Sequence, residues 1–347
     1  MPEQSNDSIV SVRARLRALF DAADGEARRD VIVLAIDGIP FGFAATCWQR
    51  AELQKLRSVF PTTSSTAWLS SLTGEEVSEH GIPGVAFALS SGELINVYDY
   101  REELGPRPRS NIFTDAADAG YAPIAVLGDL APLDCTWREL LLQGAERTGG
   151  TAFFGKPEHS PEEIPDLVRQ EIESARERGS RQPKFIWCFI DADLHIHRHG
   201  YDLALEQCLK GLEVLAIELA EGGAIVASHS DHGLIKTKPD PALQELLLEA
   251  ERHCDRPMGG AGRTRWLYPS EGRKDSLLAM LRKRVPAGIR VEESGFFFPA
   301  GSKPEVRAGS IFIIAEGDHF LMPEGHQYEH GSLTNEELFV PFALWRQ

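Results

Sequence analysis

Carboxylate and imidazole side chains gather in four short segments of this 347-residue sequence, three of which directly follow an apolar run. These candidate ligands are Asp37, Asp191, Asp193, His195, His197, His199, Asp231, His232, His326 and His330. Carboxylates supply the negative charge that a divalent cation requires, and neutral imidazoles suit borderline metals such as Zn²⁺ and Mn²⁺. A single Asp after a strand is more often a helix cap or a turn residue, but four such segments in one chain favour a metal site.

The segment 191–199 offers two overlapping pairs of ligands. Asp191 with His195, and Asp193 with His197, are each spaced four residues apart. On a helical turn this spacing places both side chains of a pair on one face. Three alternating histidines cannot all point the same way, so the segment also suits a solvated turn. The residue types alone leave the choice between the two pairs open.

Five consecutive hydroxyl residues lie at 62–66, between Pro61 and a helix-like stretch that Gly74 would end. Hydroxyl residues in such a place commonly form a turn and a helix cap. A helix N-terminus also presents free backbone N–H groups and the positive end of the helix dipole, which together attract an anion. A divalent ion that touched one of these hydroxyls would lower its pKa and favour nucleophilic attack on phosphorus.

Short apolar runs predict the buried strands that would position these ligands, at 31–36, 123–128, 184–190 and 223–228. Amphipathic helical patterns lie before or between them, at 12–20, 162–177 and 203–220. Strands that alternate with helices predict a doubly wound α/β fold, with a mostly parallel central sheet and helices on both faces. In such a fold ligands bind at the carboxyl ends of the strands, where most of the candidate residues stand.

The pattern of the sequence changes between residues 240 and 310. Two helix-like stretches, 241–252 and 274–284, enclose a glycine-rich turn and a short apolar segment. We predict that residues 240–310 form a small α+β insertion, a cap over the site. The catalytic core would then comprise residues 1–239 and 311–347.

The composition argues against several classes of partner. The formal net charge of −16 disfavours nucleic acid or an anionic membrane surface. No apolar run approaches the ~18 residues that span a bilayer, and the N-terminal segment lacks the apolar core of a signal peptide. The five cysteines are scattered without a CxxC pair, as expected for reduced thiols. We therefore predict a cytoplasmic protein with a small-molecule substrate, and leave its oligomeric state open.

The order of these motifs resembles the alkaline phosphatase superfamily, and within it the nucleotide pyrophosphatase/phosphodiesterase family and its compact bacterial relatives. The family pattern opens with a strand ending in Asp-Gly, then a proline and, three residues later, a hydroxyl nucleophile at a helix start. Thr-Gly, His-Gly, Asp-x-x-x-His, Ser-Asp-His-Gly and a last His-Gly follow. In this sequence the motifs are Asp37-Gly38, Pro61, Ser64, Thr73-Gly74, His80-Gly81, Asp193 to His197, Ser230 to Gly233, and His330-Gly331. The resemblance covers residues 31–345.

The resemblance implies an alkaline phosphatase-like fold and two divalent metal ions, zinc or alternatively manganese. The ligands of one ion would be Asp37, Ser64, Asp231 and His232. The ligands of the other would be Asp193, His197 and His330. It also implies that Ser64 attacks phosphorus and forms a phosphoseryl intermediate, in hydrolysis of a phosphodiester or nucleotide pyrophosphate. The alternatives are a phosphomonoesterase, a phosphomutase or phosphonate hydrolase of the same superfamily, and an inactive metal-dependent binding protein.

Two positions depart from the family pattern. The family nucleophile is usually Thr, where this chain has Ser64. An Asn three residues later usually helps to hold the phosphoryl oxygens, where this chain has Ala67. We expect Thr66 and the backbone N–H of Ser65 to contact those oxygens instead. The nucleophile segment contains no Arg or Lys, which favours diesters because monoesters carry an additional negative charge.

Two further groups of residues are candidates for substrate contacts. The cations Lys236, Lys238, Arg263 and Arg265 could reach the substrate from the cap or its hinge, or remain solvated. Three aromatic side chains could line a leaving-group pocket or pack in the core: Phe41, Phe43 and Trp68. The sequence does not decide these roles, nor does it name the substrate.

Overall fold

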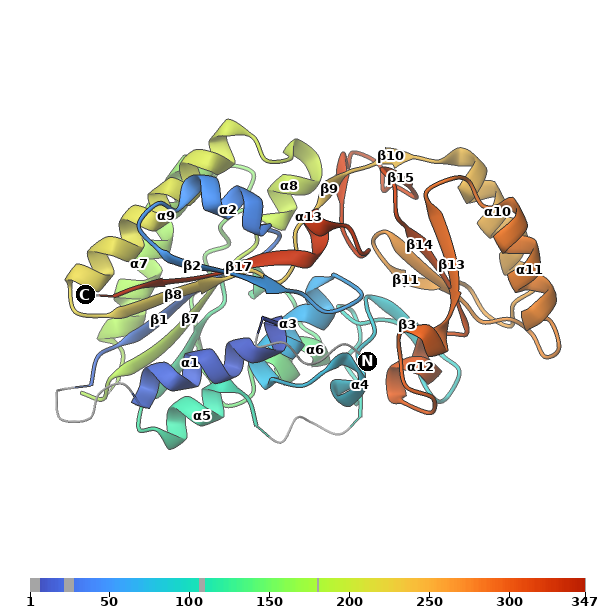
Figure 1. Cartoon of the computed structure of the whole chain (residues 1–347). Helices are drawn as coiled ribbons and strands as arrows, with labels where there is room; N and C mark the ends of the chain where they lie inside the picture. Colours follow the sequence, from blue (N-terminus) through green and yellow to red (C-terminus); the bar gives the residue numbers. More distant parts are fainter. Residues whose placement is uncertain (1–6, 22–27, 106–109, 180, 347) are drawn as a thin grey trace.

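The computed structural model describes residues 7–21, 28–105, 110–179 and 181–346 (Figure 1). Within these residues, seven strands form the main sheet in the order β2-β17-β8-β1-β7-β5-β6. In that order their bounds are Glu52–Arg57, Phe339–Trp345, Ile225–His229, Val31–Ile36, Lys184–Ile190, Ala122–Val126 and Glu146–Thr148. Neighbouring strands are parallel except where β17 pairs with β2 and β8. The predicted doubly wound, mostly parallel α/β fold is confirmed.

Helices cover both faces of the main sheet (Figure 1). The helices on one face are α1 (Val12–Asp21), α3 (Ser64–Thr73), α5 (Ile112–Asp118) and α6 (Thr136–Leu141), and those on the other are α2 (Phe41–Cys47), α7 (Ile164–Glu177) and α9 (Leu203–Glu221). Alternate residues of β1 enter the two core clusters beneath them, Val31, Val33 and Ala35 in one and Ile32, Leu34 and Ile36 in the other. Such a strand is apolar throughout because water reaches neither of its faces.

A second, antiparallel sheet of six described strands has the order β13-β14-β12-β11-β3-β4. In that order the bounds are Ile289–Glu293, Ile311–Ala315, Thr264–Leu267, Gly259–Ala261, Ala86–Ala88 and Leu94–Asn96. The helices α10 (Pro241–Glu251) and α11 (Lys274–Arg284) pack on it through a third core cluster (Figure 1).

The extent of the second sheet corrects the predicted boundaries of the cap. We assigned residues 311–347 to the core, but β14, at 311–315, pairs with β12 and β13. We also assigned residues 1–239 to the core, but β3 and β4, within 86–96, form one edge of the second sheet. A short apolar strand loses the same surface to water in either sheet, so its sequence does not reveal which partner it pairs with.

Short elements complete the chain between and around the two sheets. β9 (Ile235–Lys236) pairs with β16 (Tyr328–Glu329), and β10 (Lys238–Pro239) pairs with β15 (His319–Phe320). The remaining helices are α4 (Val77–His80), α8 (Asp193–His199), α12 (Lys303–Arg307) and α13 (Asn335–Leu338), with 3-10 turns at Ile9–Ser11, Gly128–Leu130, Pro161–Glu163 and Ser294–Phe296. In the part of the chain that the structure describes, no helix is both long and apolar enough to cross a bilayer.

Candidate active site

Three neighbouring parallel strands, β8, β1 and β7, end at the same edge of the main sheet and bring three carboxylates together there. Asp37 follows β1 directly, Asp231 lies two residues after β8, and Asp193 begins α8 after β7. All three residues are buried. Asp231 Oδ1 accepts the backbone N–H of Gly38 at 3.2 Å, which joins the ends of β8 and β1. Residues far apart in the sequence thus meet at the edge where α/β folds bind ligands.

Ser64 is the first residue of α3, and its side chain contacts two groups of this edge. Ser64 Oγ lies 3.3 Å from Asp37 Oδ1 and 3.2 Å from His232 Nε2. Trp68, one turn further along α3, donates its Nε1–H to Asp37 Oδ2 at 2.8 Å. The helix ends as predicted at Gly74, whose φ of 71° lies in the left-handed region. The hydroxyl cluster therefore places one serine, at a helix N-terminus, beside a carboxylate and an imidazole.

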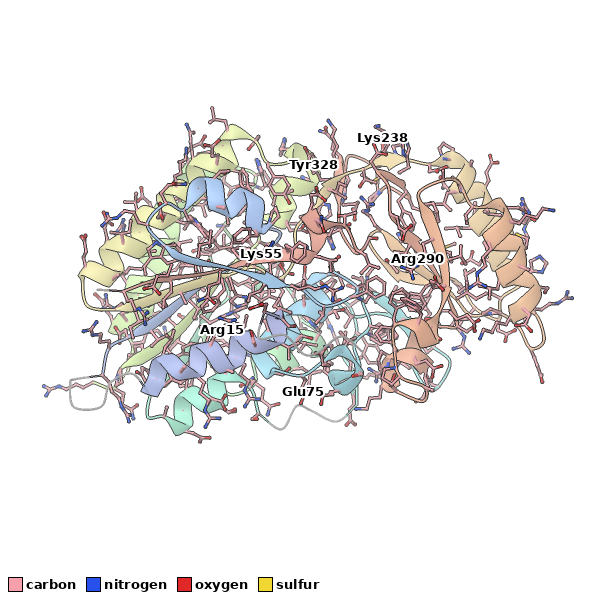
Figure 2. All side chains as sticks on the ribbon, viewed as in Figure 1. Arg15, Lys55, Glu75, Lys238, Arg290 and Tyr328 are labelled. Carbon is pink, nitrogen blue, oxygen red and sulfur yellow. The ribbon has the colours of Figure 1, made fainter. Side chains whose placement is uncertain are left out.

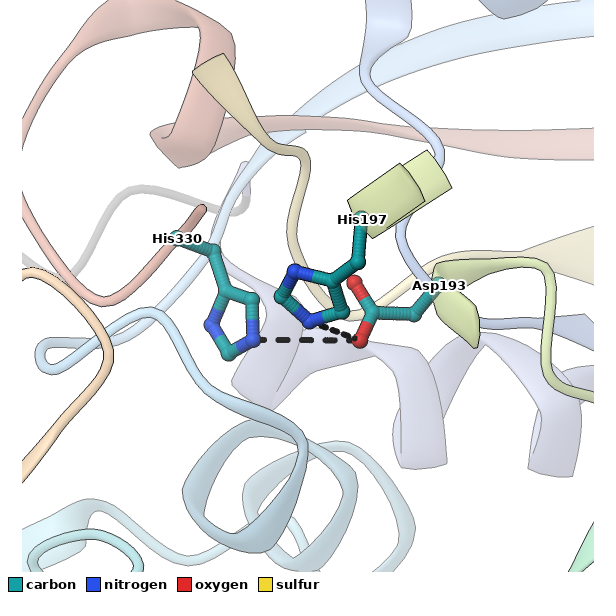
Figure 3. A group of neighbouring side chains, drawn as sticks. All are labelled: Asp193, His197 and His330. Atoms are coloured by element: carbon teal, nitrogen blue, oxygen red, sulfur yellow. Dashed lines mark ion pairs between the residues drawn. The ribbon is translucent and has the colours of Figure 1, made fainter. Parts of the chain in front are cut away.

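A second group of side chains, Asp193, His197 and His330, converges at the same edge (Figure 3). His197 Nε2 lies 2.8 Å from Asp193 Oδ2, and His330 Nε2 lies 3.8 Å from the same oxygen. Both Nδ1–H groups donate to backbone carbonyls, that of His197 to Tyr328 at 2.8 Å and that of His330 to Thr62 at 2.9 Å. These hydrogen bonds set the tautomers and turn both Nε2 atoms toward the carboxylate, as in metal-ligating histidines.

The structure brings one of the two ligand pairs of segment 191–199 into this group. Asp193 and His197 share a face of α8, whereas His195 Nε2 pairs with Asp202 Oδ1 at 3.0 Å. His199 is exposed and packs its ring on His195. Asp191 Oδ1 accepts the backbone N–H of Leu194 at 3.2 Å, the ordinary role of an Asp before a helix.

Burial makes this cluster of carboxylates unfavourable without a counter-charge. Burial, and then the charges of Asp231 and Asp193, raise the pKa of Asp37 well above its usual range. Burial raises the pKa of Asp231 to about 8. Burial also lowers the pKa of His232 and of His330 to about 4, so both imidazoles are neutral at pH 7. A divalent cation would favour the ionised carboxylates and accept the neutral imidazoles as ligands.

Unpaired polar atoms support the same interpretation. Asp193 Oδ1, Asp231 Oδ2 and His232 Nδ1 are buried, and none has a hydrogen-bond partner among the described residues. Buried polar atoms are normally paired, so such a group indicates a ligand that the protein atoms do not supply. Among the described residues, Asp193, His197 and His330, and likewise Asp37, Asp193 and His232, bring their carboxylate and imidazole atoms close enough to share a metal ion.

A third cluster adjoins the Asp193 group and was only partly anticipated. His326, a candidate from the sequence, stacks on His197 with ring centroids 4.2 Å apart. Its Nδ1–H donates to Glu329 Oε1 at 2.8 Å. His197, His326 and Glu329 lie close enough to share an ion. We missed Glu329 because no Asp-His or His-Gly motif includes it.

A cavity of about 390 Å³ opens beside Ser64 and the Asp193 group. The polar part of its wall consists of Asp37, Thr63, Ser64, Asp191, Asp193, His197, Arg198, His326 and His330. The apolar part consists of Val85, Tyr98, Leu130, Leu133, Trp137, Phe189 and Leu194. Sequence reasoning missed the apolar part, because its residues come from separate segments and share no motif that distinguishes them from core residues.

The residues that we predicted to contact phosphate do not line this cavity with their side chains. Thr66 is fully buried and donates its hydroxyl to the carbonyl of Ile82 at 3.3 Å. Ser65 is fully buried as well, and its hydroxyl has no partner among the described residues. Ala67 packs in the core. A contact between the backbone N–H of Ser65 and phosphate stays a prediction.

The aromatic candidates have other roles. Phe41 and Phe43 line a different cavity, of about 430 Å³, together with Tyr201 and Phe339. Trp68 is fully buried, and its contact with the site is the hydrogen bond to Asp37. Of the three, only Trp68 therefore contacts a predicted metal ligand.

The four candidate cations lie outside the residues that line the cavity beside Ser64. Lys236 is exposed, and Lys238 pairs with Asp318 at 2.8 Å on the surface (Figure 2). Arg263 is buried, and its Nε lies 3.7 Å from Glu337 Oε1. Arg265 donates to backbone carbonyls of its own turn. Arg198, an exposed residue, is the one Arg or Lys among the described residues of the wall.

Comparisons by sequence give no relatives: no family model matches the chain, and no curated protein matches it. Comparisons by structure give several. Murine ectonucleotide pyrophosphatase/phosphodiesterase 5 superposes with a TM-score of 0.63 at 15% identity, over 91% of this chain and 88% of that protein. Its human counterpart gives a TM-score of 0.64 at 15% identity, over 91% and 87% of the two chains.

Phosphonoacetate hydrolase from Sinorhizobium meliloti is a further structural neighbour, with a TM-score of 0.64 at 18% identity over 92% of this chain and 90% of the other. An inactive form of the murine enzyme has been solved with AMP, and the hydrolase with phosphonoformate and with phosphonoacetate. At these identities the likeness concerns the fold. The chain thus has the alkaline phosphatase-like fold that the nucleotide pyrophosphatase/phosphodiesterases share with phosphonoacetate hydrolase.

Proposed function

We propose that this chain is a metal-dependent phosphoester hydrolase in which Ser64 is the nucleophile. The observation that carries the proposal is the position of the Ser64 hydroxyl, which lies at a helix N-terminus, within 3.3 Å of Asp37 and of His232, on the wall of the cavity beside the Asp193 group. A helix N-terminus stabilises a phosphoryl group through free N–H groups and its dipole. The ligands solved in the structural neighbours, AMP and phosphonoacetate, support a small phosphorus-containing substrate.

Two divalent cations, zinc or alternatively manganese, belong to this proposal. Four residues would hold one ion: Asp37, Ser64, Asp231 and His232. Three would hold the other: Asp193, His197 and His330. When bound, the ions supply positive charge that lowers the pKa of the Ser64 hydroxyl and stabilises the charge developing on the leaving oxygen.

The chain's own groups orient Ser64 for attack. The Ser64 hydroxyl donates to Asp37 Oδ1, while Trp68 holds the other oxygen of Asp37. Ser64 gives its proton to solvent, and Oγ forms a bond to phosphorus as the bond to the leaving oxygen breaks; the leaving oxygen takes the electron pair and then a proton from water. In the second step a water oxygen forms a bond to phosphorus, the bond from phosphorus to Oγ breaks, and Oγ takes a proton, which restores Ser64.

The cavity favours phosphodiesters with an apolar substituent over phosphomonoesters. A monoester carries an additional negative charge, which active sites usually balance with a cation near the phosphate. Here the one Arg or Lys among the described wall residues, Arg198, is exposed. The apolar wall offers a surface for an aryl ring or a nucleobase instead, with Val85, Leu130, Leu133, Trp137 and Phe189.

The test compares bis-p-nitrophenyl phosphate with p-nitrophenyl phosphate on zinc-loaded protein. We expect kcat/KM for the diester to be higher by about tenfold or more. Ser64→Ala should abolish turnover, whereas Ser65→Ala, which removes a buried hydroxyl outside the cavity wall, should retain it. Faster hydrolysis of the monoester would support a phosphomonoesterase, and release of phosphate from phosphonoacetate would support a phosphonate hydrolase. Failure to hydrolyse any of these compounds would contradict the proposal.

A further inference from the structure

The site lacks the side-chain amide that the family resemblance would place three residues after the nucleophile. Ala67 occupies that position and is fully buried in the core. Thr66 donates its hydroxyl to the carbonyl of Ile82, and Ser65 is not among the residues that line the cavity. The side chains of residues 65–67 therefore offer no donor to the cavity, and a further side-chain donor for the phosphoryl oxygens would come from another element.

Tyr98 presents a hydroxyl at the required place. It lines the same cavity as Ser64. A phenol keeps its hydrogen at neutral pH and can donate it to a ligand oxygen. Tyr98 thus offers a neutral donor on the wall of the cavity that Ser64 also lines.

The tyrosine ring is held in place by its neighbours. The ring of Trp137 packs against that of Tyr98 at 90°, with centroids 5.2 Å apart. Trp137 in turn donates its Nε1–H to the carbonyl of Ser65 at 2.8 Å, in the first turn of α3. The Tyr98 backbone N–H donates to Asn96 Oδ1 at 3.0 Å. The donor and the nucleophile are therefore fixed to the same helix end, which is the preorganisation that stabilises a transition state.

A second hydroxyl in the same place has no assigned role. Thr63 immediately precedes α3 and lines the cavity, yet only 1% of the residue is exposed. Its hydroxyl makes no capping hydrogen bond and has no partner among the described residues. A buried hydroxyl without a partner, beside the nucleophile, points to a bound ligand.

We propose that the Tyr98 hydroxyl, with that of Thr63, donates a hydrogen bond to a non-bridging oxygen of the phosphoryl group that Ser64 attacks. The proposal rests on the proposed function and adds a catalytic residue to it. Tyr98 takes the role that an amide at position 67 would have, from the turn that follows β4 rather than from α3. Its hydrogen bond strengthens as negative charge develops on the oxygen, so it acts on kcat rather than on substrate binding.

The test removes this hydroxyl and leaves the ring. In zinc-loaded protein acting on bis-p-nitrophenyl phosphate, we expect Tyr98→Phe to lower kcat by about 10²–10³-fold. We expect its KM to change by less than about threefold. The matched control is Tyr100→Phe, two residues further along and outside the cavity wall, which should behave as wild type. Thr63→Val should lower kcat by about tenfold.

Orthovanadate binding, measured calorimetrically, gives a readout that does not depend on turnover. We expect Tyr98→Phe to weaken it by about tenfold or more, with zinc content and melting temperature as in wild type. An unchanged kcat with unchanged vanadate affinity would overturn the role of Tyr98. If wild type hydrolyses no phosphoester but Tyr98→Phe still weakens vanadate binding, the proposed function is wrong, whereas the role of Tyr98 as a hydrogen-bond donor to the bound oxyanion is supported. If vanadate does not bind to wild type, both fail.

Discussion

Replacing Arg263 with Met should destabilise the fold strongly, because Arg263 is a buried cation between the second sheet and the catalytic edge. The side chains of Arg263 and Glu337 are both 0% exposed, with Nε and Oε1 3.7 Å apart. The guanidinium also donates to Thr237 Oγ1 at 3.1 Å and to the carbonyl of Gly317. Without it, the Glu337 carboxylate stays buried and loses its counter-charge.

The structure gives a magnitude for this loss. Two unit charges 3.7 Å apart attract by about 4.5 kcal/mol at an effective dielectric constant of ~20. Removal of one partner from a buried pair costs about 3–5 kcal/mol, a large share of the ~5–15 kcal/mol that stabilises a typical domain. The double change Arg263→Met with Glu337→Gln removes the unpaired charge as well. We therefore expect it to recover part of the loss, about 1–2 kcal/mol.

Urea unfolding measures these differences in the free energy of unfolding. The matched control is Lys238→Met, which removes an exposed cation that pairs with Asp318 at 2.8 Å and should cost less than about 1 kcal/mol. The reasoning is refuted if Arg263→Met costs no more than this control. It is also refuted if adding Glu337→Gln makes the Arg263→Met protein less stable.

Three further predictions concern the site and its surroundings. Burial, with Arg307 and Lys303 nearby, lowers the pKa of His80 to about 3. Unfolded protein therefore binds a proton that folded protein does not, so His80 destabilises the fold as the pH falls below about 6.5. Chemical unfolding should show wild type losing about 1 kcal/mol more than His80→Asn between pH ~6.5 and ~5.5, and parallel losses would contradict this pKa. Trp68→Phe removes the donor to Asp37 and should weaken zinc binding by about 10–100-fold in chelator competition, so unchanged affinity would exclude this orienting role. His197→Gln should lower bound zinc by one ion per chain in elemental analysis, because His197 belongs to the proposed ligand set. His195→Gln should leave the zinc content unchanged, because His195 pairs with Asp202 instead. The reverse pattern would mean that Asp191 and His195 are the ligand pair.

Much of the core fold follows from the sequence because its strands and helices have strong, separate periodicities. The predicted strand at 184–190 and the predicted helix at 274–284 are observed with the same bounds, and the helix predicted at 203–220 ends at 221. Continuous apolar runs indicate strands that are buried on both faces. The end of each such strand is also visible in the sequence, because polar residues follow the apolar run directly. The helix start near Ser64 was predictable from the hydroxyl residues that precede the helix and the glycine that ends it, whereas the choice of Ser64 among those hydroxyls came from the family resemblance.

Other features depend on contacts between distant segments. The apolar run at 311–315 gives no sign that it pairs with β12 rather than with the main sheet. The cavity wall joins Tyr98 and Trp137, which have no common motif, and their roles depend on how the turn after β4 and helix α6 pack beside α3. The choice of His197 over His195 depends on a carbonyl from residue 328, more than a hundred positions away. A spacing of four residues describes both pairs equally well.

The His-Gly motif at 330–331 shows how a close contact explains a pattern that spacing alone does not. Gly331 has φ of 111°, in the left-handed region, and a Cβ there would overlap the carbonyl of Ala261. The backbone N–H of Arg263 donates to the carbonyl of His330 at 2.6 Å. The second sheet thus packs directly on the segment that carries a metal ligand of the proposed site, and a larger residue at 331 would displace it.

The most direct test of the central claim, that Ser64 attacks phosphorus, is to trap the covalent intermediate. Zinc-loaded protein would be quenched with acid during turnover of bis-p-nitrophenyl phosphate, digested, and sequenced by tandem mass spectrometry. The account predicts a phosphoryl ester on Ser64, with or without the retained nitrophenyl group, and no such ester in Ser64→Ala. An ester on Thr63 or Ser65, or turnover by Ser64→Ala at the wild-type rate, would contradict it.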